Sequence, residues 1–216
     1  MILYASQTHG KRNLKALREN GFSLLVTPDT WERGGHRPPI WDDGTPAPFA
    51  LDNGAFGCFQ RGEAFNWGKF NELVGALGDA AAWVVAPDIV AGGLDSLKMS
   101  VKWREGWASC PVLLAVQDGM KPENVAPFLD ETTGIAVGGS TEFKIKTLPI
   151  WARLAARSNC YLHVLRVNTR RRLVACSLAG AHSVDGTSAS IFSVNAPKLK
   201  RWTEEINNQQ TLGFWK

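Results

Sequence analysis

The stretch at residues 182–190, HSVDGTSAS, carries the pattern on which the rest of the chain is built. A short apolar run ends in one carboxylate, Asp185, and a glycine and small hydroxyl residues follow at once. Similar runs that end in a polar residue or in glycine occur upstream: PFALDNG (48–54), WVVAPD (83–88), LLAVQDG (113–119) and IAVGGS (135–140). The repetition predicts a sheet whose strands bring polar groups or bare backbone to the same edge.

These runs belong to a longer alternation of strand-like and helix-like segments. Short apolar runs predict strands at 2–6, 22–27, 49–51, 82–86, 112–116, 134–137, 161–167 and 183–185. Apolar residues at helical spacing, together with capping residues, predict helices at 13–20, 66–77, 95–107, 122–129, 142–156, 170–178 and 197–207. Residues 28–48, rich in Gly, Pro and Trp, are predicted to form a long loop.

The alternation predicts the fold class. Eight strand–helix units in 216 residues point to an α/β protein, a minimal (β/α)8 TIM barrel that forms one domain over residues 1–216. A doubly wound open sheet is the alternative, but it usually needs fewer units and a glycine-rich first turn, and GxGxxG is absent. In a barrel the polar strand ends would meet at one mouth.

Composition narrows the class of protein. A net charge of +4 and a pI near 9.0 fit a polyanionic partner without requiring one. The four cysteines show no CxxC and no zinc spacing with histidine, so a metal site and a zinc module are not expected. Neither a signal pattern nor an apolar run long enough for a membrane span is present, so we expect a soluble protein of the cytoplasm, which would be the host cell's if a phage encodes it.

The strand ends place three carboxylates and an amide where catalytic groups of a barrel lie. Asp52, Asp88 and Asp185 would raise one another's pKa, which favours a catalytic use, although Asp52 and Asp185 also sit in good turn sequences. Two carboxylates that face each other across a glycosidic bond can carry out retaining substitution at an anomeric carbon. A further carboxylate with Gln117 and backbone N–H groups suits the edge of a purine-like base.

One aromatic residue and one glycine pair near these strand ends each allow two functional or structural interpretations. Phe56 could stack on a flat ring or be a core aromatic. The glycine pair of VGGS, Gly138 and Gly139, could form a phosphate nest instead of a wall of a base pocket.

The motifs resemble, in order, segments of the tRNA-guanine transglycosylase superfamily. The resemblance is closest to the small phage-type branch that exchanges guanine for a 7-deazaguanine in DNA, and it covers residues 52–188. ALDNGAF implies Asp52 as general acid/base and Phe56 as stacking aromatic, and SVDGTS implies Asp185 as nucleophile. The other implied base-binding residues, from VVAPD, LAVQDG, IAVGGS and YLHVLRV, are Asp88, Gln117, Gly138, Gly139 and Leu165.

The implied activity is that of a glycosyltransferase. Asp185 would expel guanine and form a covalent sugar ester, and a preQ0-type 7-deazaguanine, deprotonated by Asp52, would then replace it without a cofactor. The chain departs from the family at Asn53 and Ala55 and lacks the family's cysteine-rich zinc module. The missing zinc module favours DNA over tRNA as the nucleic-acid partner. The second partner implied is the free 7-deazaguanine base. A guanine in duplex DNA would have to be flipped out of the helix before it could react.

Basic residues on two predicted helices fit a phosphate backbone as well as a solvated surface. Three arginines open the helix at 170–178, where positive charge is unfavourable to the helix dipole. The candidate nucleic-acid-binding residues are Arg170, Arg171, Arg172, Lys198, Lys200 and Arg201. The segment GGHRPPIW, 34–41, could clasp a strand near the mouth, and we interpret His163 and His182 as structural.

Three other functions stay open at this point. A nucleosidase or base-excising enzyme would begin identically, with water in place of the incoming base. A non-catalytic nucleic-acid-binding barrel is disfavoured by the three aspartates. A tRNA-acting enzyme would need a partner chain to hold its substrate.

Overall fold

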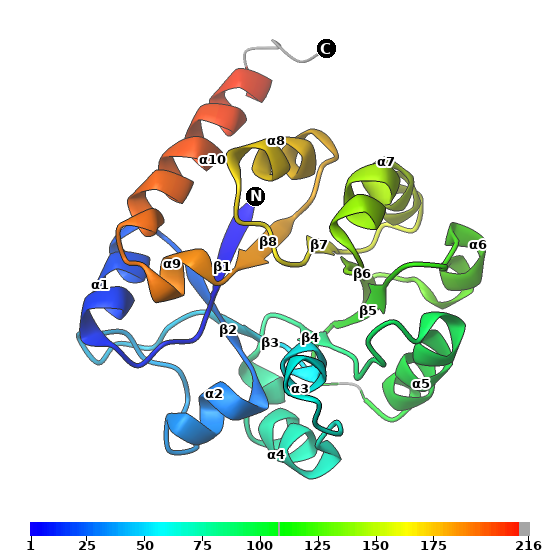
Figure 1. Ribbon diagram of the computed structural model, residues 1–216, viewed down its shortest axis with the longest axis horizontal. Helices are drawn as coiled ribbons and strands as arrows, with labels where there is room; N and C mark the ends of the chain where they lie inside the picture. Colours follow the sequence, from blue (N-terminus) through cyan, green and yellow to red (C-terminus); the bar gives the residue numbers. More distant parts are fainter. Residues whose placement is uncertain (108, 212–216) are drawn as a thin grey trace.

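The computed structural model describes residues 1–107 and 109–211, and its centre is a closed barrel of parallel strands in the order β1 to β8 (Figure 1). The strands are β1 (Ile2–Ser6), β2 (Ser23–Val26), β3 (Phe49–Leu51), β4 (Val84–Val85), β5 (Val112–Val116), β6 (Thr133–Val137), β7 (Leu162–Val164) and β8 (Ser183–Gly186). β8 pairs in parallel with β1, from Ile2 opposite Ser183 to Ala5 opposite Gly186, and so closes the ring. The predicted (β/α)8 barrel is confirmed, and the open sheet is wrong.

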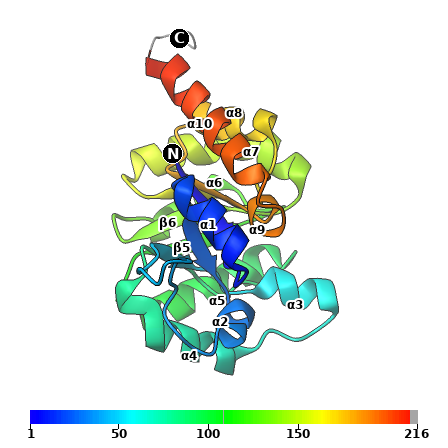
Figure 2. The ribbon, with the colours of Figure 1, turned by 90° about the vertical axis from the view of Figure 1, so that its left-hand side faces the viewer.

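Helices surround the barrel on its outside (Figures 1 and 2). They are α1 (Lys11–Glu19), α2 (Pro28–Arg33), α3 (Ala55–Arg61), α4 (Trp67–Leu77), α5 (Gly93–Glu105), α6 (Pro122–Val125), α7 (Thr141–Arg157), α8 (Arg170–Leu178), α9 (Ser188–Ile191) and α10 (Asn195–Thr211), with short 3-10 helices η1 (Gly78–Ala80) and η2 (Ala126–Phe128). α10 packs on α8 and α9 and carries the chain away from the barrel (Figure 2).

The strands bury both faces, which explains their continuous apolar sequence. One set of side chains fills the barrel, with Trp83 and Tyr4 at its centre 5.0 Å apart between ring centroids. The opposite set, such as Leu24 and Val26 of β2, packs under the helices. The barrel interior is therefore a packed core, and ligands have access only at its ends.

Local capping explains where several helices begin. Ser140 and Thr169 accept hydrogen bonds from backbone N–H groups of the first turns of α7 and α8. The predicted cap of α5, Asp95, is wrong: the helix begins at Gly93, and Asp95 pairs with Lys98 on the surface.

The predicted loop at 28–48 contains a helix that the sequence analysis missed. α2 starts directly after β2 because Thr27 and Thr30 form a reciprocal capping box, and Pro28 occupies the first helical position, where its missing N–H costs nothing. α3 and α9 were also missed. Both are short, with 7 and 4 residues, so they show little periodicity.

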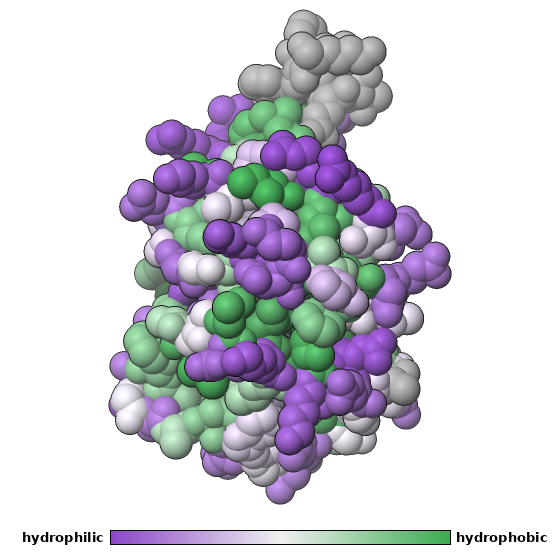
Figure 3. Space-filling model, turned by 90° about the vertical axis from the view of Figure 1, so that its right-hand side faces the viewer, coloured by the Kyte–Doolittle hydropathy of each residue, from purple (hydrophilic) through white to green (hydrophobic). Residues whose placement is uncertain are grey.

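The outer surface mixes polar and apolar side chains. Figure 3 shows the face over α5, α6 and α7, where apolar atoms lie exposed among hydrophilic ones. Ile145, Ile150 and Phe128 are among the exposed apolar residues of the chain. In the described ranges, no helix has the length and apolar character needed to cross a membrane.

Candidate acid–base site at the barrel mouth

Closure of the barrel brings the polar strand ends together. Asp52 follows β3, Asp88 follows β4, and Asp185 lies near the end of β8. Arg166 lies two residues after β7. The charges of Asp185, Asp88 and Arg166 all act on the pKa of Asp52, so these four groups form one electrostatic unit at the carboxyl ends of the strands.

Asp52 is the group whose proton affinity is changed most clearly. Burial raises its pKa to about 7, with a smaller rise from the negative charges of Asp185 and Asp88. The Gly54 N–H donates a 2.7 Å hydrogen bond to Asp52 Oδ1, and Arg166 lies nearby; both oppose the rise. A carboxyl group with this pKa holds a proton about half of the time at neutral pH and can give or take it.

Asp88 is held in place by Asn53, a residue to which the sequence analysis assigned no function. The buried Asn53 amide nitrogen donates to Asp88 Oδ1 at 2.8 Å and to the Ala86 carbonyl at 2.6 Å. Its oxygen accepts from the Ala55 N–H at 2.8 Å. Burial raises the pKa of Asp88, while the Asn53 hydrogen bond and Arg166 oppose this rise.

Asn53→Ala is expected to lower the free energy of unfolding by about 2–3 kcal/mol, because the Ala86 carbonyl, the Ala55 N–H and Asp88 all lose a buried partner. It should also raise the pKa of Asp88 further, because the variant lacks a donor to the carboxylate. Urea unfolding measures the first effect and carboxyl NMR titration the second. Asn66→Ala, which removes only the exposed cap of α4, is the control and should cost about 1 kcal/mol.

Asp185 is anchored through one oxygen. Its Oδ1 accepts from the Arg166 backbone N–H at 2.9 Å and lies 3.2 Å from His163 Nε2, while His163 Nδ1 hydrogen-bonds Ser183 Oγ at 2.7 Å. Oδ2 makes no hydrogen bond within residues 1–107 and 109–211. The buried His163 ring therefore holds Asp185 in position through Oδ1.

Arg166 supplies the positive charge of the site, and the sequence analysis missed it. Its guanidinium donates to the Gly139 carbonyl at 2.7 Å and lies 4.0 Å from the centroid of the Phe56 ring. Its backbone has a φ of 59°, a strained conformation for a residue with a side chain, and such strain is often found at functional sites. The sequence signal for Arg166 is that it is the polar residue directly after the apolar end of the strand motif HVL. The prediction assigned the preceding residue, Leu165, to the site instead.

The predicted base-binding groups are largely engaged within the protein. Gln117 is buried, and its amide nitrogen donates to the Ile89 carbonyl at 2.9 Å. The Gly138 N–H donates to Val116 in the sheet at 2.8 Å, and Leu165 packs against the barrel interior. Phe56 is exposed over 38% of its surface, and its ring contacts Arg166.

Gly139 is required by its neighbour Asp118. Its φ is 71°, and a Cβ at this position would lie 2.4 Å from Asp118 Oδ2. Asp118 in turn accepts two 2.7 Å hydrogen bonds from Ser140, the cap of α7. The glycine therefore serves a tight turn between β6 and α7.

Gly139→Ala is expected to lower the free energy of unfolding by about 1–3 kcal/mol, because it adds backbone strain and displaces Asp118 from Ser140. Gly138→Ala is the matched control, because its Cβ would meet Leu165 and Val116 only at 3.4 Å. Thermal unfolding of the two variants should separate them by several degrees, and equal melting temperatures would contradict the assignment.

Most of the predicted nucleic-acid-binding cations have partners on the protein surface. Arg170 pairs with Glu205, Lys200 with Glu204 and Arg201 with Glu205. Arg172 donates to Thr141, and Lys198 lies over the Trp202 ring. These contacts do not test binding of nucleic acid by these residues or by Arg171, which stays a prediction.

One cavity reaches the site. A hollow of about 380 Å³ between α3 and α5 includes Asp88 in its lining, together with the aromatic residues Phe59, Phe65 and Trp67. Among the described residues, no group of three or more His, Cys, Asp or Glu side chains could hold a metal ion.

Comparison with known proteins supports the fold. No family model and no curated protein matches the chain. Similar solved structures include 3-hexulose-6-phosphate synthase from Salmonella typhimurium, at 12% identity and TM-score 0.53 over 97% of this chain and 99% of that one. Dihydrodipicolinate synthase from Oceanobacillus iheyensis is 14% identical with a TM-score of 0.53, over 99% of this chain and 76% of that one. Tryptophan synthase from M. tuberculosis is 17% identical with a TM-score of 0.50, over 95% of this chain and 90% of that one. At these identities the likeness shows the barrel alone.

The resemblance to the tRNA-guanine transglycosylase superfamily is wrong, and so is the expected exchange of guanine for 7-deazaguanine by a glycosyltransferase. No model of that family matches, and the similar structures include barrels described as synthases. The physical reason is that an apolar run ending in a polar residue and glycine is what strands of a parallel barrel commonly present. The predicted partners, DNA and a free 7-deazaguanine, followed from that resemblance and stay untested.

Proposed function

We propose that this protein is a lyase or synthase that makes or breaks a carbon–carbon bond beside a carbonyl group by acid–base catalysis. The observation that carries the proposal is the raised pKa of Asp52, about 7, next to the guanidinium of Arg166 and the open oxygen of Asp185. The synthase names of similar barrels support the class of reaction by analogy of fold only.

The site groups suit the cleavage of a β-hydroxy carbonyl compound. Asp52 in its ionised form would take the proton of the hydroxyl group. The carbon–carbon bond then breaks, the hydroxyl carbon becomes a carbonyl, and the electron pair moves onto the original carbonyl oxygen as an enolate. Arg166 would stabilise that negative charge, and the protonated Asp52 would return its proton to the enolate carbon.

The other carboxylates indicate the kind of substrate. Asp185 Oδ2 and Asp88 are acceptors, so they would bind hydroxyl groups and repel additional negative charge near them. The hollow of about 380 Å³ beside Asp88 has room for a small molecule. We therefore infer an uncharged polyhydroxylated ketone.

Proton exchange at the carbon next to the carbonyl tests this function across the whole substrate class at once. The protein is incubated in D2O with a panel of uncharged ketoses, and ¹H NMR follows loss of signal at that carbon and any cleavage products. We expect exchange that Asp52→Asn removes and that Asp95→Asn, an exposed carboxylate paired with Lys98, keeps. Exchange that survives in Asp52→Asn, or none with any compound, would contradict the proposal.

The proposed location of this activity is the cytoplasm. All four cysteines are free thiols, and two of them, Cys160 and Cys176, are buried in the core. Free thiols are typical of reducing compartments, which supports this location.

A further inference from the structure

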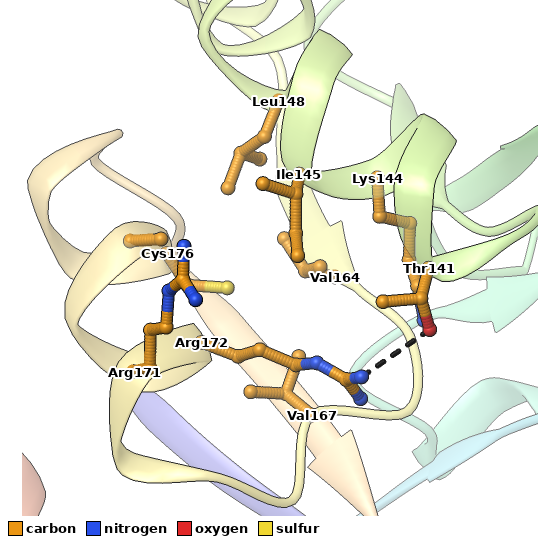
Figure 4. Close-up of a pocket in the computed structure, with 10 residues that line it drawn as sticks. Thr141, Lys144, Ile145, Leu148, Val164, Val167, Arg171, Arg172 and Cys176 are labelled. Atoms are coloured by element: carbon orange, nitrogen blue, oxygen red, sulfur yellow. Dashed lines mark hydrogen bonds between the residues drawn. The ribbon is translucent and has the colours of Figure 1, made fainter.

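A second cavity lies outside the barrel, between α7 and α8 and behind β7 (Figure 4). Val164 of β7 and Val167 form its floor, and Ile145 and Leu148 of α7 form one wall. Its volume of about 50 Å³ exceeds the ~10–15 Å³ that one water molecule needs, so it can hold a small organic group. Strand alternation separates it from the mouth, because His163 points to Asp185 while Val164 faces the helices.

Three cations line this cavity without a carboxylate partner in the described part of the chain. Lys144 is buried, and its Nζ donates only to the Leu165 carbonyl, at 2.7 Å. Arg172 donates to the neutral hydroxyl of Thr141 at 3.3 Å, as the dashed line in Figure 4 marks, and Arg171 has no hydrogen bond or ion pair there. The adjacent Arg170, by contrast, points away and pairs with Glu205.

The electrostatics of the cluster favour an anion. The pKa of Lys144 is lowered to about 8, chiefly by burial and also by the positive charges of Arg166 and Arg172, while the negative charge of Asp185 opposes the shift. A negative charge placed between these cations would remove the repulsion. Guanidinium groups match a planar carboxylate, because they can donate two parallel hydrogen bonds to it.

We propose that the cavity between α7 and α8 binds a small branched carboxylate, with its charge on Arg171, Arg172 and Lys144 and its alkyl group on the apolar floor and wall. The apolar lining of Val164, Val167, Ile145 and Leu148 gives a tail its contact surface and offers nothing to a fully hydrated anion. The lining of this cavity contains none of the four charged groups of the acid–base site, and the proposed binding does not depend on the proposed function.

Isothermal titration calorimetry with isobutyrate tests the site, and isobutyramide serves as a neutral ligand of the same shape. We expect isobutyrate to bind, and isobutyramide and inorganic phosphate to bind at least about tenfold more weakly. Isobutyramide lacks the negative charge, and phosphate lacks the alkyl group. Binding of phosphate or isobutyramide as tight as that of isobutyrate would overturn the assignment, and so would the absence of isobutyrate binding.

Variants separate this cavity from other binding sites. Arg171→Gln and Arg172→Gln should each weaken isobutyrate binding about tenfold, whereas Arg170→Gln, its neighbour on α8, should leave it unchanged. Ala175→Leu fills the cavity without changing a charge and should abolish binding. Asp52→Asn should bind normally, so a failed acid–base function would not affect this result. Equal affinity in Arg170→Gln and Arg171→Gln would contradict the proposal.

Discussion

Asp52→Asn is expected to lower the turnover of the protein by about 10²–10⁴-fold, because an amide cannot take or return the proton in the reaction. In deuterium exchange, the ionised form of Asp52 removes the proton from the carbon next to the carbonyl. The exchange rate of the unmodified protein should therefore rise with pH through about 7, the pKa of this group. The measurement is the deuterium-exchange rate between pH 5 and pH 9.

The same substitution has an effect on stability that needs no substrate. Asp52 has a pKa of about 7 in the folded chain, against 3.8 for an unperturbed carboxyl group, so the folded state binds the proton more tightly. The resulting stabilisation is complete below pH 3.8 and is lost as the pH rises through about 7. The loss is at most about 4 kcal/mol, because one pKa unit corresponds to ~1.4 kcal/mol.

Asp52→Asn removes this pH dependence, because the amide does not ionise. Urea unfolding at pH 5 and pH 8 should therefore show a smaller difference in unfolding free energy for the variant than for the unmodified protein. Asp95→Asn is the control, since this exposed carboxylate lies outside the site. A difference between the two pH values that Asp52→Asn leaves intact would contradict the raised pKa of Asp52.

The barrel could be predicted from the sequence because its strands are buried on both faces. Such strands read as short continuous apolar runs, and their alternation with helical patterns leaves few topologies. The limits of the prediction were local. β7 was expected at 161–167 but ends at Val164, because Arg166 adopts a positive φ that an extended strand does not allow. Sequence periodicity carries no signal for such a turn.

The site could be predicted only in part. The strand-end carboxylates Asp52, Asp88 and Asp185 were found because barrel topology alone places them at one mouth. The contacts of Asn53 with Asp88 and of His163 with Asp185 were not predicted, because they are hydrogen bonds between neighbouring strands, which no single segment reveals. Gln117 was identified as a ligand-binding amide, but its side chain supports the loop at Ile89.

The incorrect family resemblance has a related cause. Five strand-end motifs in the right order looked specific for the family. Their order, however, follows from the order of the strands in the barrel. Their similar composition arises because each is a buried apolar strand followed by a turn. Motifs of this kind are therefore not independent of the fold. Evidence for a function has to come from side chains whose environment the fold alone does not require, such as the guanidinium of Arg166, whose charge acts on both Asp52 and Asp88.

Arg166→Met is expected to raise the pKa of Asp52 above its present value of about 7, because Arg166 is the cation that opposes the rise. The pKa of Asp88 should rise for the same reason. An enolate in the mouth would lose its cationic partner, so the exchange rate should fall by about 10²–10³-fold, as expected when one electrostatic donor to a developing charge is removed. The fold should persist, because Asp185 is bound by the backbone N–H of this residue and not by its side chain.

The pH of half-maximal rate decides whether Arg166 acts as a charge or only as a packing partner of Phe56. Arg166→Met keeps apolar contact with the ring but has no charge, so a midpoint that moves to higher pH reports the electrostatic role. Arg170→Met, four residues along the chain and paired with Glu205 on the surface, should leave both the rate and the midpoint unchanged. If Arg166→Met lowered the rate without moving the midpoint, Arg166 would not control the proton affinity of Asp52, and the reaction assigned to this pair would lose its basis.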